Sequence, residues 1–363
     1  MNGIKFSLAI VFFLFFHQLV FSQNTVCFTI EANINNGLAF SGFTKFVNVL
    51  DCFEVYAEPT ISDSKVLHAA AVAAELLDND EDGIVDDINL KNELSSSGAL
   101  IPIFSFDGSS AEQTFFNNYN GNGAAAVLYN NEMDPSQTGY WGADATVEEV
   151  IHVINAVGHT SIYPNAFDIS PNSSLMSAAM DVARGGQFLT VPSNYPPSAW
   201  YHYDDVTCDY GCMAIEYMYW SIVSLMGILN DPATCAGIAN EWEPCSPTLF
   251  QSTDTLMYAL ITDPQYMLPT LAPDGNYCPQ GMNIVFNNEN DFLLYPNPGN
   301  GDFKFTQPLN QSISYKLFTI AGELLQINTL NKSTQSIDLQ YLKNGIYTIK
   351  INNKFFQKLV ISK

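Results

Sequence analysis

Positive charge is scarce in this sequence. Its 363 residues include 13 Lys and Arg against 37 Asp and Glu, and Arg184 is the only arginine. So acidic a surface argues against binding of nucleic acid or of anionic membranes, because both carry negative charge. An acidic surface of this kind instead favours binding of divalent cations, high solubility or a salty environment. We expect Arg184 to pair with a carboxylate, either Asp181 or one from a cleft, or to clamp a substrate carboxylate.

Several catalytic signatures are also missing. The sequence contains no G-x-S-x-G motif, no phosphate-binding glycine loop and no internal repeat. These absences argue against serine chemistry of the α/β-hydrolase type and against nucleotide hydrolysis. Glycoside hydrolysis by two carboxylates stays open, because the many acidic residues offer many pairs.

Residues 1–22 have the features of a secretory signal peptide. Lys5 supplies the positive start, residues 8–16 form the apolar run, and cleavage before Gln23 is plausible. The apolar run is short for a membrane span, so we expect no integral membrane segment after its removal. No cysteine directly follows the cut, which argues against a lipoprotein. The mature protein is therefore expected to leave the cytoplasm.

Seven cysteines lie in the mature chain before residue 290. They are Cys27, Cys52, Cys208, Cys212, Cys235, Cys245 and Cys278. In an oxidising compartment they predict up to three disulfides and one odd thiol, with the pairing open. The spacing of Cys208 and Cys212 also suits zinc, but oxidation argues against thiolate ligands there.

The last seventy residues differ from the rest in charge and pattern. Residues 295–363 hold eight lysines against three acidic residues, a net charge of +5, whereas the residues before them carry −29. Short alternating runs separated by Gly and Asn turns predict a small antiparallel β-sandwich. Its marker residues are Tyr295, Pro296, Asn297, Pro298, Gly345, Ile346, Tyr347 and Lys358.

This segment resembles, nearly element by element, the type A C-terminal sorting domain of the type IX secretion system of Bacteroidota. The resemblance implies an immunoglobulin-like β-sandwich that is recognised by the type IX secretion machinery. It also implies export to the periplasm and passage across the outer membrane, followed by release or attachment at the cell surface. We therefore divide the chain into a signal peptide (1–22), a cargo domain (23–283), a linker (284–292) and a sorting domain (293–363).

A calcium loop is predicted directly after the helix expected at residues 62–77. Carboxylates at loop positions 1, 3 and 5 are followed by Gly83, and a backbone carbonyl and late carboxylates complete the set. The predicted ligands are Asp78, Asp80, Asp82, Ile84, Asp86 and Asp87. The motif resembles EF-hand, dockerin and thrombospondin type 3 loops but has Asn89 at position 12. We expect Ile84 to use its carbonyl while its side chain packs inward. The alternative is an acidic turn that caps a helix.

The stretch 146–159 predicts a helix with chemistry on one face. At about 100° per residue, Glu148, His152, Asn155 and His159 lie on one side, and valines and an isoleucine lie on the other. Glu148 and His152 are neighbours at this spacing and could grip one ion, with Glu149 as general base. The alternative is an amphipathic surface helix whose polar face meets water.

This stretch resembles the zincin metalloprotease motif H-E-x-x-H, with Glu148 in place of the first His. The resemblance implies zinc or another divalent transition metal, with His159 as a further ligand by analogy with metzincins. Glu216 is the alternative third ligand, in the position type that gluzincins use, because a carboxylate on the apolar helix expected at 213–229 is unfavourable unless paired or liganding. Glu216 on an exposed stripe of that helix is the competing interpretation.

The cargo domain is expected to be α+β. We expect strands over residues 26–30, 99–106 and 123–129, with 43–57 ambiguous, and helices over 62–77, 90–94, 109–119, 148–159, 173–184, 213–229, 235–242 and 248–261. The predicted class is therefore a mixed α/β, zincin-like N-terminal domain with a largely helical second half, followed by the β-sandwich. His68 is expected to be a packed or capping residue, and the aromatic stretch 200–205 to line a polymer-binding groove or a core edge.

Two functions remain open from the sequence. The first is a calcium-stabilised, metal-dependent hydrolase acting on peptide bonds outside the cell. The second is a non-enzymatic calcium-binding surface or adhesive protein on a degenerate zincin-like scaffold. They differ in whether Glu148, His152 and Glu216 converge on a common ion.

Overall fold

The computed structural model describes residues 27–138, 143–279, 294–305, 313–319, 324–331, 336–351 and 355–363. The predicted signal peptide and the predicted linker lie outside these residues. Mixed helices and strands are followed by a C-terminal β-region, so the α+β prediction is confirmed. The C-terminal region has a hydrophobic core of its own, separate from those formed between Ala39 and Tyr277.

A five-stranded sheet underlies the first half of the chain. Its strands are β1 (Glu31–Ala32), β2 (Lys45–Val49), β3 (Phe53–Ala57), β4 (Leu100–Phe104) and β5 (Leu128–Tyr129), in that order across the sheet. The first three pair antiparallel, whereas β3–β4 and β4–β5 pair parallel. Strand β4 is buried along its whole length, as a strand covered on both faces requires.

Two strand predictions need correction. The ambiguous residues 43–57 form the β2–β3 hairpin, but the strand predicted at 26–30 is wrong, because the first strand is Glu31–Ala32. The backbone of Cys27 instead bonds to Tyr277, near the end of the cargo region. The strand predicted at 123–129 shrinks to Leu128–Tyr129, since only those residues pair with β4.

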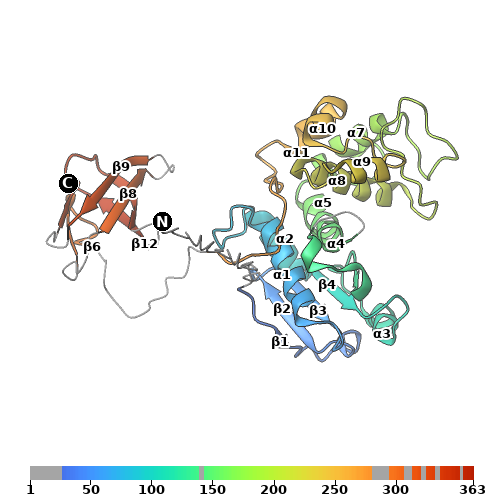
Figure 1. Ribbon diagram of the computed structural model, residues 1–363, viewed down its shortest axis with the longest axis horizontal. Helices are drawn as coiled ribbons and strands as arrows, with labels where there is room; N and C mark the ends of the chain where they lie inside the picture. Colours follow the sequence, from blue (N-terminus) through green and yellow to red (C-terminus); the bar gives the residue numbers. More distant parts are fainter. Residues whose placement is uncertain are drawn as a thin grey trace, which may run out of the picture.

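Helix α1 (Asp63–Leu77) lies beside the sheet and the motif helix α4 (Thr146–Val153) (Figure 1). Residues 69–74 are alanines apart from Val72, and all are buried. Such small side chains allow close approach of α1 to β2, β3 and α4, while alanine also has the highest helix propensity. Helices α2 (Ile88–Ser97) and α3 (Ser110–Asn118) complete this half.

The second half is largely helical, as predicted. Its further helices are η4 (Ile154–His159, a π-helix), α5 (Thr160–Ile162), α6 (Pro164–Phe167), α7 (Leu175–Ala183), α8 (Tyr210–Met226), α9 (Pro232–Ile238), α10 (Pro247–Thr253) and α11 (Thr255–Ile261). Helices α7–α11 gather on the side away from the sheet (Figure 1).

The helix predicted at 248–261 is divided at Asp254. This carboxylate caps α11 by accepting from the Met257 N–H at 3.1 Å, so a new helix starts there. Its other oxygen accepts bonds from the Trp200 indole at 2.9 Å and the Tyr217 hydroxyl at 2.6 Å. A single buried carboxylate therefore joins α8, α11 and the aromatic stretch.

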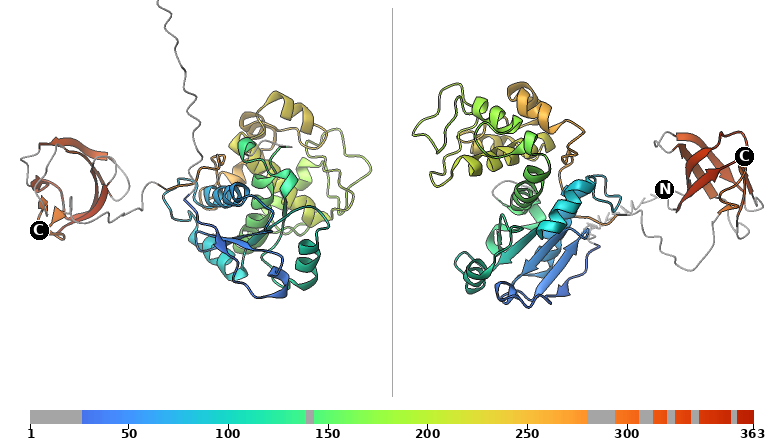
Figure 2. Two further views of the ribbon diagram at one scale, coloured as in Figure 1. Left: turned by 60° about the horizontal axis from the view of Figure 1, so that its bottom comes forward. Right: turned by 180° about the vertical axis from the view of Figure 1, so that it is seen from behind.

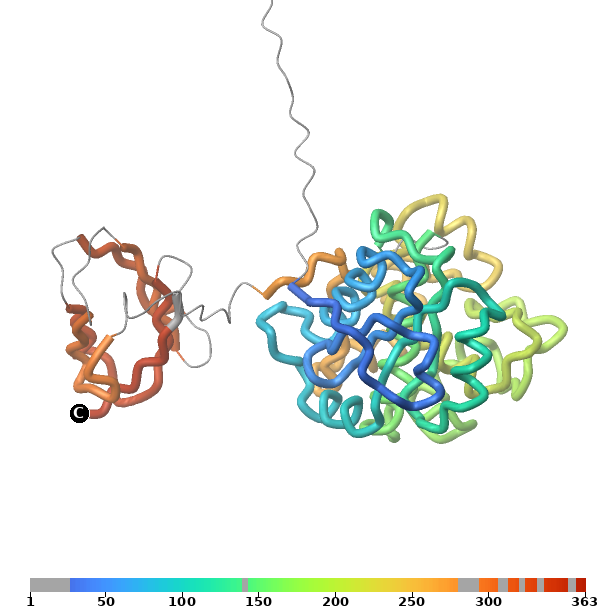
Figure 3. Tube along the Cα trace, turned by 90° about the horizontal axis from the view of Figure 1, so that it is seen from below, coloured from blue at the N-terminus to red at the C-terminus, as the bar shows by residue number. Residues whose placement is uncertain are grey.

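Three disulfides and one free thiol are present, as the cysteine count predicted. The pairs are Cys27–Cys278, Cys208–Cys212 and Cys235–Cys245. The first bond joins positions 251 residues apart, so the two ends of the cargo region lie side by side (Figure 3). Cys52 is buried and unpaired, and burial raises the pKa of its thiol to about 11, which keeps it protonated.

The C-terminal region consists of two antiparallel sheets. Strands β6 (Leu294–Tyr295), β7 (Asp302–Phe305) and β10 (Ser336–Asp338) form one, and β8 (Ile313–Thr319), β9 (Leu324–Leu330), β11 (Gly345–Ile351) and β12 (Phe355–Ile361) form the other. The sheets curve around a shared core that includes Phe303, Leu317 and Ile349 (Figure 2). This is the predicted small β-sandwich.

We predict that removing Cys27–Cys278 costs much more stability than removing Cys235–Cys245, because cross-linking a longer loop restricts the unfolded chain more. The two closed loops span 251 and 10 residues. In the chain-entropy treatment the C27S/C278S variant should lose about 3 kcal/mol more than C235S/C245S. Urea unfolding of both double variants measures the difference, and equal losses would contradict it.

Candidate metal centre

Helices α4 and α8 pack against one another and bring three predicted ligands together. Glu148 and His152 stand one turn apart on α4, and Glu216 faces them from α8. One side-chain oxygen or nitrogen of each lies within 4.8 Å of the others. His152 Nε2 is 3.4 Å from Glu216 Oε2. Two carboxylates and an imidazole that are far apart in the sequence thus share one small volume.

This cluster is largely withdrawn from water. The side chains of His152 and Glu216 are 12% and 17% exposed. His152 Nε2 is buried and makes no hydrogen bond. Burial raises the pKa of Glu148 to about 7, with Glu149 and Glu216 adding to the effect. Burial works against a charged His152, but the carboxylates of Glu149 and Glu216 outweigh it and raise the pKa of His152 to about 10. The cluster therefore favours a bound positive charge.

Glu149 lies at the other edge of the imidazole. Its Oε2 is 3.8 Å from His152 Nδ1, whereas Glu216 is next to Nε2. The Tyr219 ring meets the His152 ring edge-on at 5.3 Å. Burial raises the pKa of Tyr219, and the nearby Glu148 carboxylate adds to the effect. Glu149 and Tyr219 therefore both lie next to the His152 ring and restrict its orientation.

His159 is not brought to this cluster. It lies at the end of the π-helix η4, whose wider turn shifts the following side chains relative to an α-helical face. His159 is 1% exposed, and its Nδ1 lies 2.9 Å from Asn155 Oδ1. Burial lowers its pKa to about 4. Gly158 beside it allows α2 to approach, since an added Cβ would lie 2.3 Å from Leu90.

Glu241 lies beside α8 and is not apparent from the sequence. Its Oε1 accepts a bond from the Trp220 indole at 3.1 Å, one turn beyond Glu216 on α8. Burial raises the pKa of Glu241 to about 7, with contributions from Asp204 and Glu216. A β-bridge between Tyr201 and Trp242 holds Glu241 beside α8. A pairing between residues so far apart in the sequence leaves no local sequence pattern.

The expected pairing of Arg184 with a carboxylate is wrong. Arg184 is fully buried and donates from Nη2 to the Phe188 carbonyl at 2.8 Å. Its guanidinium lies 5.3 Å from the centre of the Phe188 ring and 5.8 Å from that of Tyr210. Aromatic faces thus take the place of a carboxylate, as guanidinium groups allow. Tyr210, not Arg184, is bonded to Asp181, at 3.0 Å.

The predicted calcium ligands divide into two groups. Asp78, Asp80 and Asp86 each place an oxygen within 4.8 Å of the others. Burial and neighbouring carboxylates raise the pKa of Asp80 and of Asp86, as crowded negative charges do. Asp87 instead caps α2 and accepts a bond from the Tyr163 hydroxyl at 2.6 Å. Asp82 accepts from the Ile84 N–H at 2.9 Å.

The loop is folded around Asp78. This fully buried carboxylate accepts from the N–H groups of Asp82 and Gly83 and from the Tyr277 hydroxyl. Gly83 has a φ of 91°, which a residue with a side chain rarely adopts. The inward packing predicted for Ile84 is wrong, because its side chain is 52% exposed. Val85 is buried instead, at 3% exposure.

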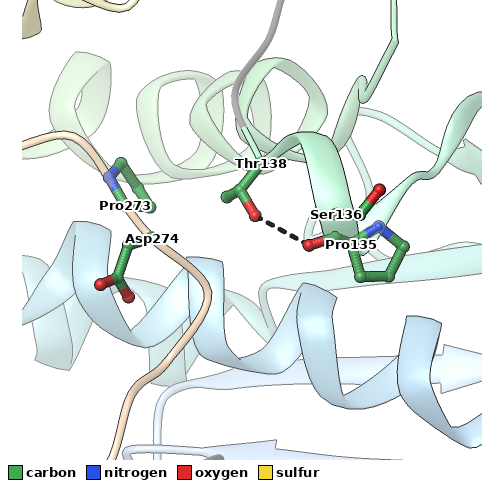
Figure 4. Close-up of a pocket in the computed structure, with 5 residues that line it drawn as sticks. All are labelled: Pro135, Ser136, Thr138, Pro273 and Asp274. Carbon is green, nitrogen blue, oxygen red and sulfur yellow. Dashed lines mark hydrogen bonds between the residues drawn. The ribbon is translucent and has the colours of Figure 1, made fainter. Parts of the chain in front are cut away.

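A surface pocket of about 550 Å³ lies elsewhere, beside α1 (Figure 4). It is lined by Pro135, Ser136, Thr138, Pro273 and Asp274. Neither proposed metal cluster contributes a lining residue. Nearby, His68 Nε2 lies 2.8 Å from Asp144 Oδ2, and both side chains are buried. His68 is thus a packed histidine, as predicted.

The sorting-motif residues are part of the C-terminal sandwich. Asn297 Oδ1 accepts from the Val360 N–H at 2.8 Å, and its amide donates to the Lys358 carbonyl. Tyr347 pairs with Leu359 across β11 and β12, while Gly345 begins β11 opposite Ile361. Asn297 therefore ties the Tyr-Pro-Asn-Pro segment to the last strand.

Two comparisons bear on this chain. Residues 293–362 match a family described as the secretion system C-terminal sorting domain. The C-terminal sandwich is therefore the sorting domain of the type IX system, and the protein is exported to the cell surface or extracellular space by that machinery. No curated protein matches the chain. Among the described residues, no helix is both long and apolar enough to cross a membrane.

We predict that His159 makes stability depend on pH. Its pKa falls from an ordinary 6.5 to about 4, so the unfolded chain binds the proton more tightly. The contribution of His159 to the free energy of unfolding is fully present above pH 6.5. It falls by roughly 3 kcal/mol as the pH falls towards 4. In H159N this part of the loss should disappear. Urea unfolding of both proteins at pH 7 and pH 4 measures it, and an unchanged loss in H159N would refute the prediction.

Proposed function

We propose that the cargo region is a metal-dependent hydrolase that acts on peptide bonds outside the cell. The observation that carries this proposal is the convergence of Glu148, His152 and Glu216 from two helices within 4.8 Å. Export as a type IX substrate places such an enzyme among extracellular polymers. The choice of peptide bonds rests on the resemblance of residues 148–152 to the zincin motif.

The donor set fits zinc or a similar first-row divalent cation. Zinc binds imidazole nitrogen and carboxylate oxygen, and three protein ligands leave one position open for water or substrate. The buried, unbonded Nε2 of His152 and the adjacent Glu216 supply the nitrogen and oxygen such an ion needs. A bound metal of this kind would acidify its water and polarise a substrate carbonyl.

The other residues have roles of their own in this proposal. Glu148 and Glu216 provide negative charge, and the Tyr219 ring packs edge-on against His152. Glu149 can accept a proton from water as general base, as predicted from the motif. Its contact with Nδ1 also supports a second role, in which it orients the His152 ring.

We also propose that the loop at residues 78–87 binds calcium. The grouping of Asp78, Asp80 and Asp86 supports this, because hard oxygen ligands suit calcium and the site is rich in negative charge. Asp78 is bonded to Tyr277, so a bound ion would join α1 to the end of the cargo region. Its role is stabilisation, which also suits the second candidate function, a non-enzymatic calcium-binding surface protein.

We predict that the purified chain holds about one zinc and that H152A loses it, because the variant removes the only nitrogen ligand of the cluster. Peptidase activity should be lost together with the bound zinc. Mass spectrometry after dialysis against a weak chelator measures the metal. H202A is the matched control, since His202 lies outside the triad. Retention of zinc by H152A, or its absence from the native chain, would refute the proposed centre.

Glu149→Gln separates the two roles of that residue. A variant that keeps full zinc but loses turnover indicates a general base. Metal affinity that falls by about 10- to 100-fold indicates an orienting contact to His152. Native metal affinity and native turnover together would remove Glu149 from the mechanism.

We predict that calcium raises the unfolding midpoint of the native chain and not that of D80N. At calcium concentrations of about 100 times Kd, binding to the folded state should add about 2.7 kcal/mol. D51N is the matched control, because Asp51 is an exposed aspartate in a turn outside the loop. Thermal unfolding with and without calcium measures the shift. Equal shifts in the native chain and D80N would show that the loop is an acidic helix cap.

A further inference from the structure

Residues 270–278 lead from the helical half of the chain to the Cys27–Cys278 disulfide. We call this segment the strap. Side chains at the end of α1 and in the loop proposed to bind calcium, residues 78–87, form hydrogen bonds with it. The strap therefore connects the proposed ion site with a covalent cross-link.

Glu75 and Asn79 hold the backbone of the strap. The buried Glu75 carboxylate accepts from three successive N–H groups, those of residues 274–276, at 3.3, 3.0 and 3.3 Å. Asn79 Oδ1 accepts from the N–H groups of residues 270 and 271 at 2.9 and 3.0 Å. Glu75 belongs to the last turn of α1, and Asn79 follows that helix directly. The position of the strap thus depends on how the end of α1 is folded.

Tyr277 is in contact with both the calcium loop and the disulfide. Its hydroxyl donates to Asp78 Oδ2 at 2.5 Å, and Asp78 is the first predicted calcium ligand. Its carbonyl accepts from the Cys27 N–H at 3.1 Å, and its ring stacks on Phe28 with 5.6 Å between the ring centres. Cys278 is the next residue in the chain. One buried tyrosine therefore lies between a predicted ligand and the cross-link.

The residues that hold the strap also hold the loop. Asn79 donates its own N–H to Asp86 Oδ2 at 3.0 Å, and Asp86 is another member of the proposed calcium cluster. Asp78 accepts from the N–H groups of residues 82 and 83 at 3.1 and 2.7 Å. A shift of Asp78 or Asn79 would therefore disturb the loop and the strap together.

This shared anchoring has an energetic consequence. A ligand binds an ion best when it is already in position, because ordering a flexible group on binding costs free energy. Tyr277 holds Asp78, and the disulfide limits where Tyr277 can move. Opening the disulfide frees the end of the strap, so Asp78 loses part of this support. Conversely, an ion bound to Asp78 would hold Tyr277 and keep Cys278 close to its partner.

We propose that calcium binding by the loop and closure of the Cys27–Cys278 disulfide stabilise one another, with Tyr277 as the positioning residue that connects them. The inference rests on the calcium site of the proposed function and states how that site is regulated. Such coupling is reciprocal, so each event favours the other by the same factor. When the disulfide is reduced, its two sulfurs gain two electrons and two protons from a dithiol, which is oxidised to a cyclic disulfide.

The first experiment measures the affinity of the full chain for calcium by titration calorimetry. We expect the Kd for calcium to be about 10-fold higher in C27S/C278S than in the native chain, a size typical of coupling between sites. C235S/C245S is the matched control, because its disulfide lies at α9, outside the strap and the loop. The Kd of this control should equal that of the native chain. Circular dichroism verifies that both variants are folded.

The second experiment measures the reciprocal effect and needs no substitution. The native chain is equilibrated with mixtures of reduced and oxidised dithiothreitol, with and without saturating calcium. Alkylation followed by mass spectrometry gives the reduced fraction of each cysteine pair. Calcium should lower the reduced-to-oxidised ratio of Cys27 and Cys278 about 10-fold, and it should leave that of Cys235 and Cys245 unchanged.

Tyr277→Phe tests the residue that connects the two sites. This variant removes the hydroxyl that donates to Asp78 and keeps the ring that stacks on Phe28. In Y277F, calcium should no longer shift the equilibrium between the reduced and oxidised forms of the disulfide. Y258F is the matched control, because Tyr258 lies on α11 and packs against Phe250. It should retain the native shift.

The outcomes separate the inference from the calcium proposal. If the native chain binds calcium, but C27S/C278S has the same Kd and calcium does not shift the disulfide equilibrium, the inference is overturned and the calcium site stands. A shift that survives in Y277F also overturns the inference, because the connection then does not pass through Tyr277. If the native chain binds no calcium, the proposed calcium site fails, and the inference fails with it.

Discussion

The fold depends on how a chain with few cations places its carboxylates. Like charges brought into a protein interior repel one another strongly unless a positive charge or hydrogen-bond donors offset them. Here backbone N–H groups, tyrosine hydroxyls and tryptophan indoles take most of that role. Asp254 with Trp200 and Tyr217, and Asp78 with Gly83 and Tyr277, are two examples. Tyrosine and tryptophan side chains thus supply both apolar surface and hydrogen-bond donors to the interior.

Two groups of carboxylates nevertheless lie close together. Glu148 and Glu216 meet at one imidazole between α4 and α8, and Asp78, Asp80 and Asp86 meet in the loop after α1. Both clusters lie on helices that pack on one another, because α1 packs on α4 and α4 packs on α8. Secretion fits this arrangement, since divalent cations and disulfide formation are both available outside the cytoplasm.

Local patterns carried much of this structure. The i, i+4 spacing of Glu148 and His152 was enough to place them on one face, and a carboxylate within an apolar helix was enough to single out Glu216. The β-sandwich followed from short alternating runs and turn residues around Tyr295 and Gly345. In each case the prediction depends only on residues that are close together in the sequence.

Features that depend on distant pairing were not predictable. An α-helical period puts His159 on the ligand face, whereas a π-helical turn intervenes in the structure. Glu241 reaches Trp220 on α8 through the pairing of Tyr201 with Trp242, which no local sequence pattern indicates. Whether Ile84 or Val85 packs inward depends on a one-residue difference in loop register. The cysteine pairing likewise depends on which ends meet in space.

The bond between Cys27 and Cys278 has a consequence for maturation. The disulfide closes the cargo region into a loop, and the sorting domain follows this loop in the sequence. If the chain were cut after residue 278, the disulfide would still join the two ends of the cargo region. Exopeptidases would then have only short free ends as substrates. Because one partner cysteine is near the last residue of the region, the loop cannot close until nearly all of the cargo has entered the periplasm. Formation of this disulfide therefore requires that the chain up to residue 278 has been exported.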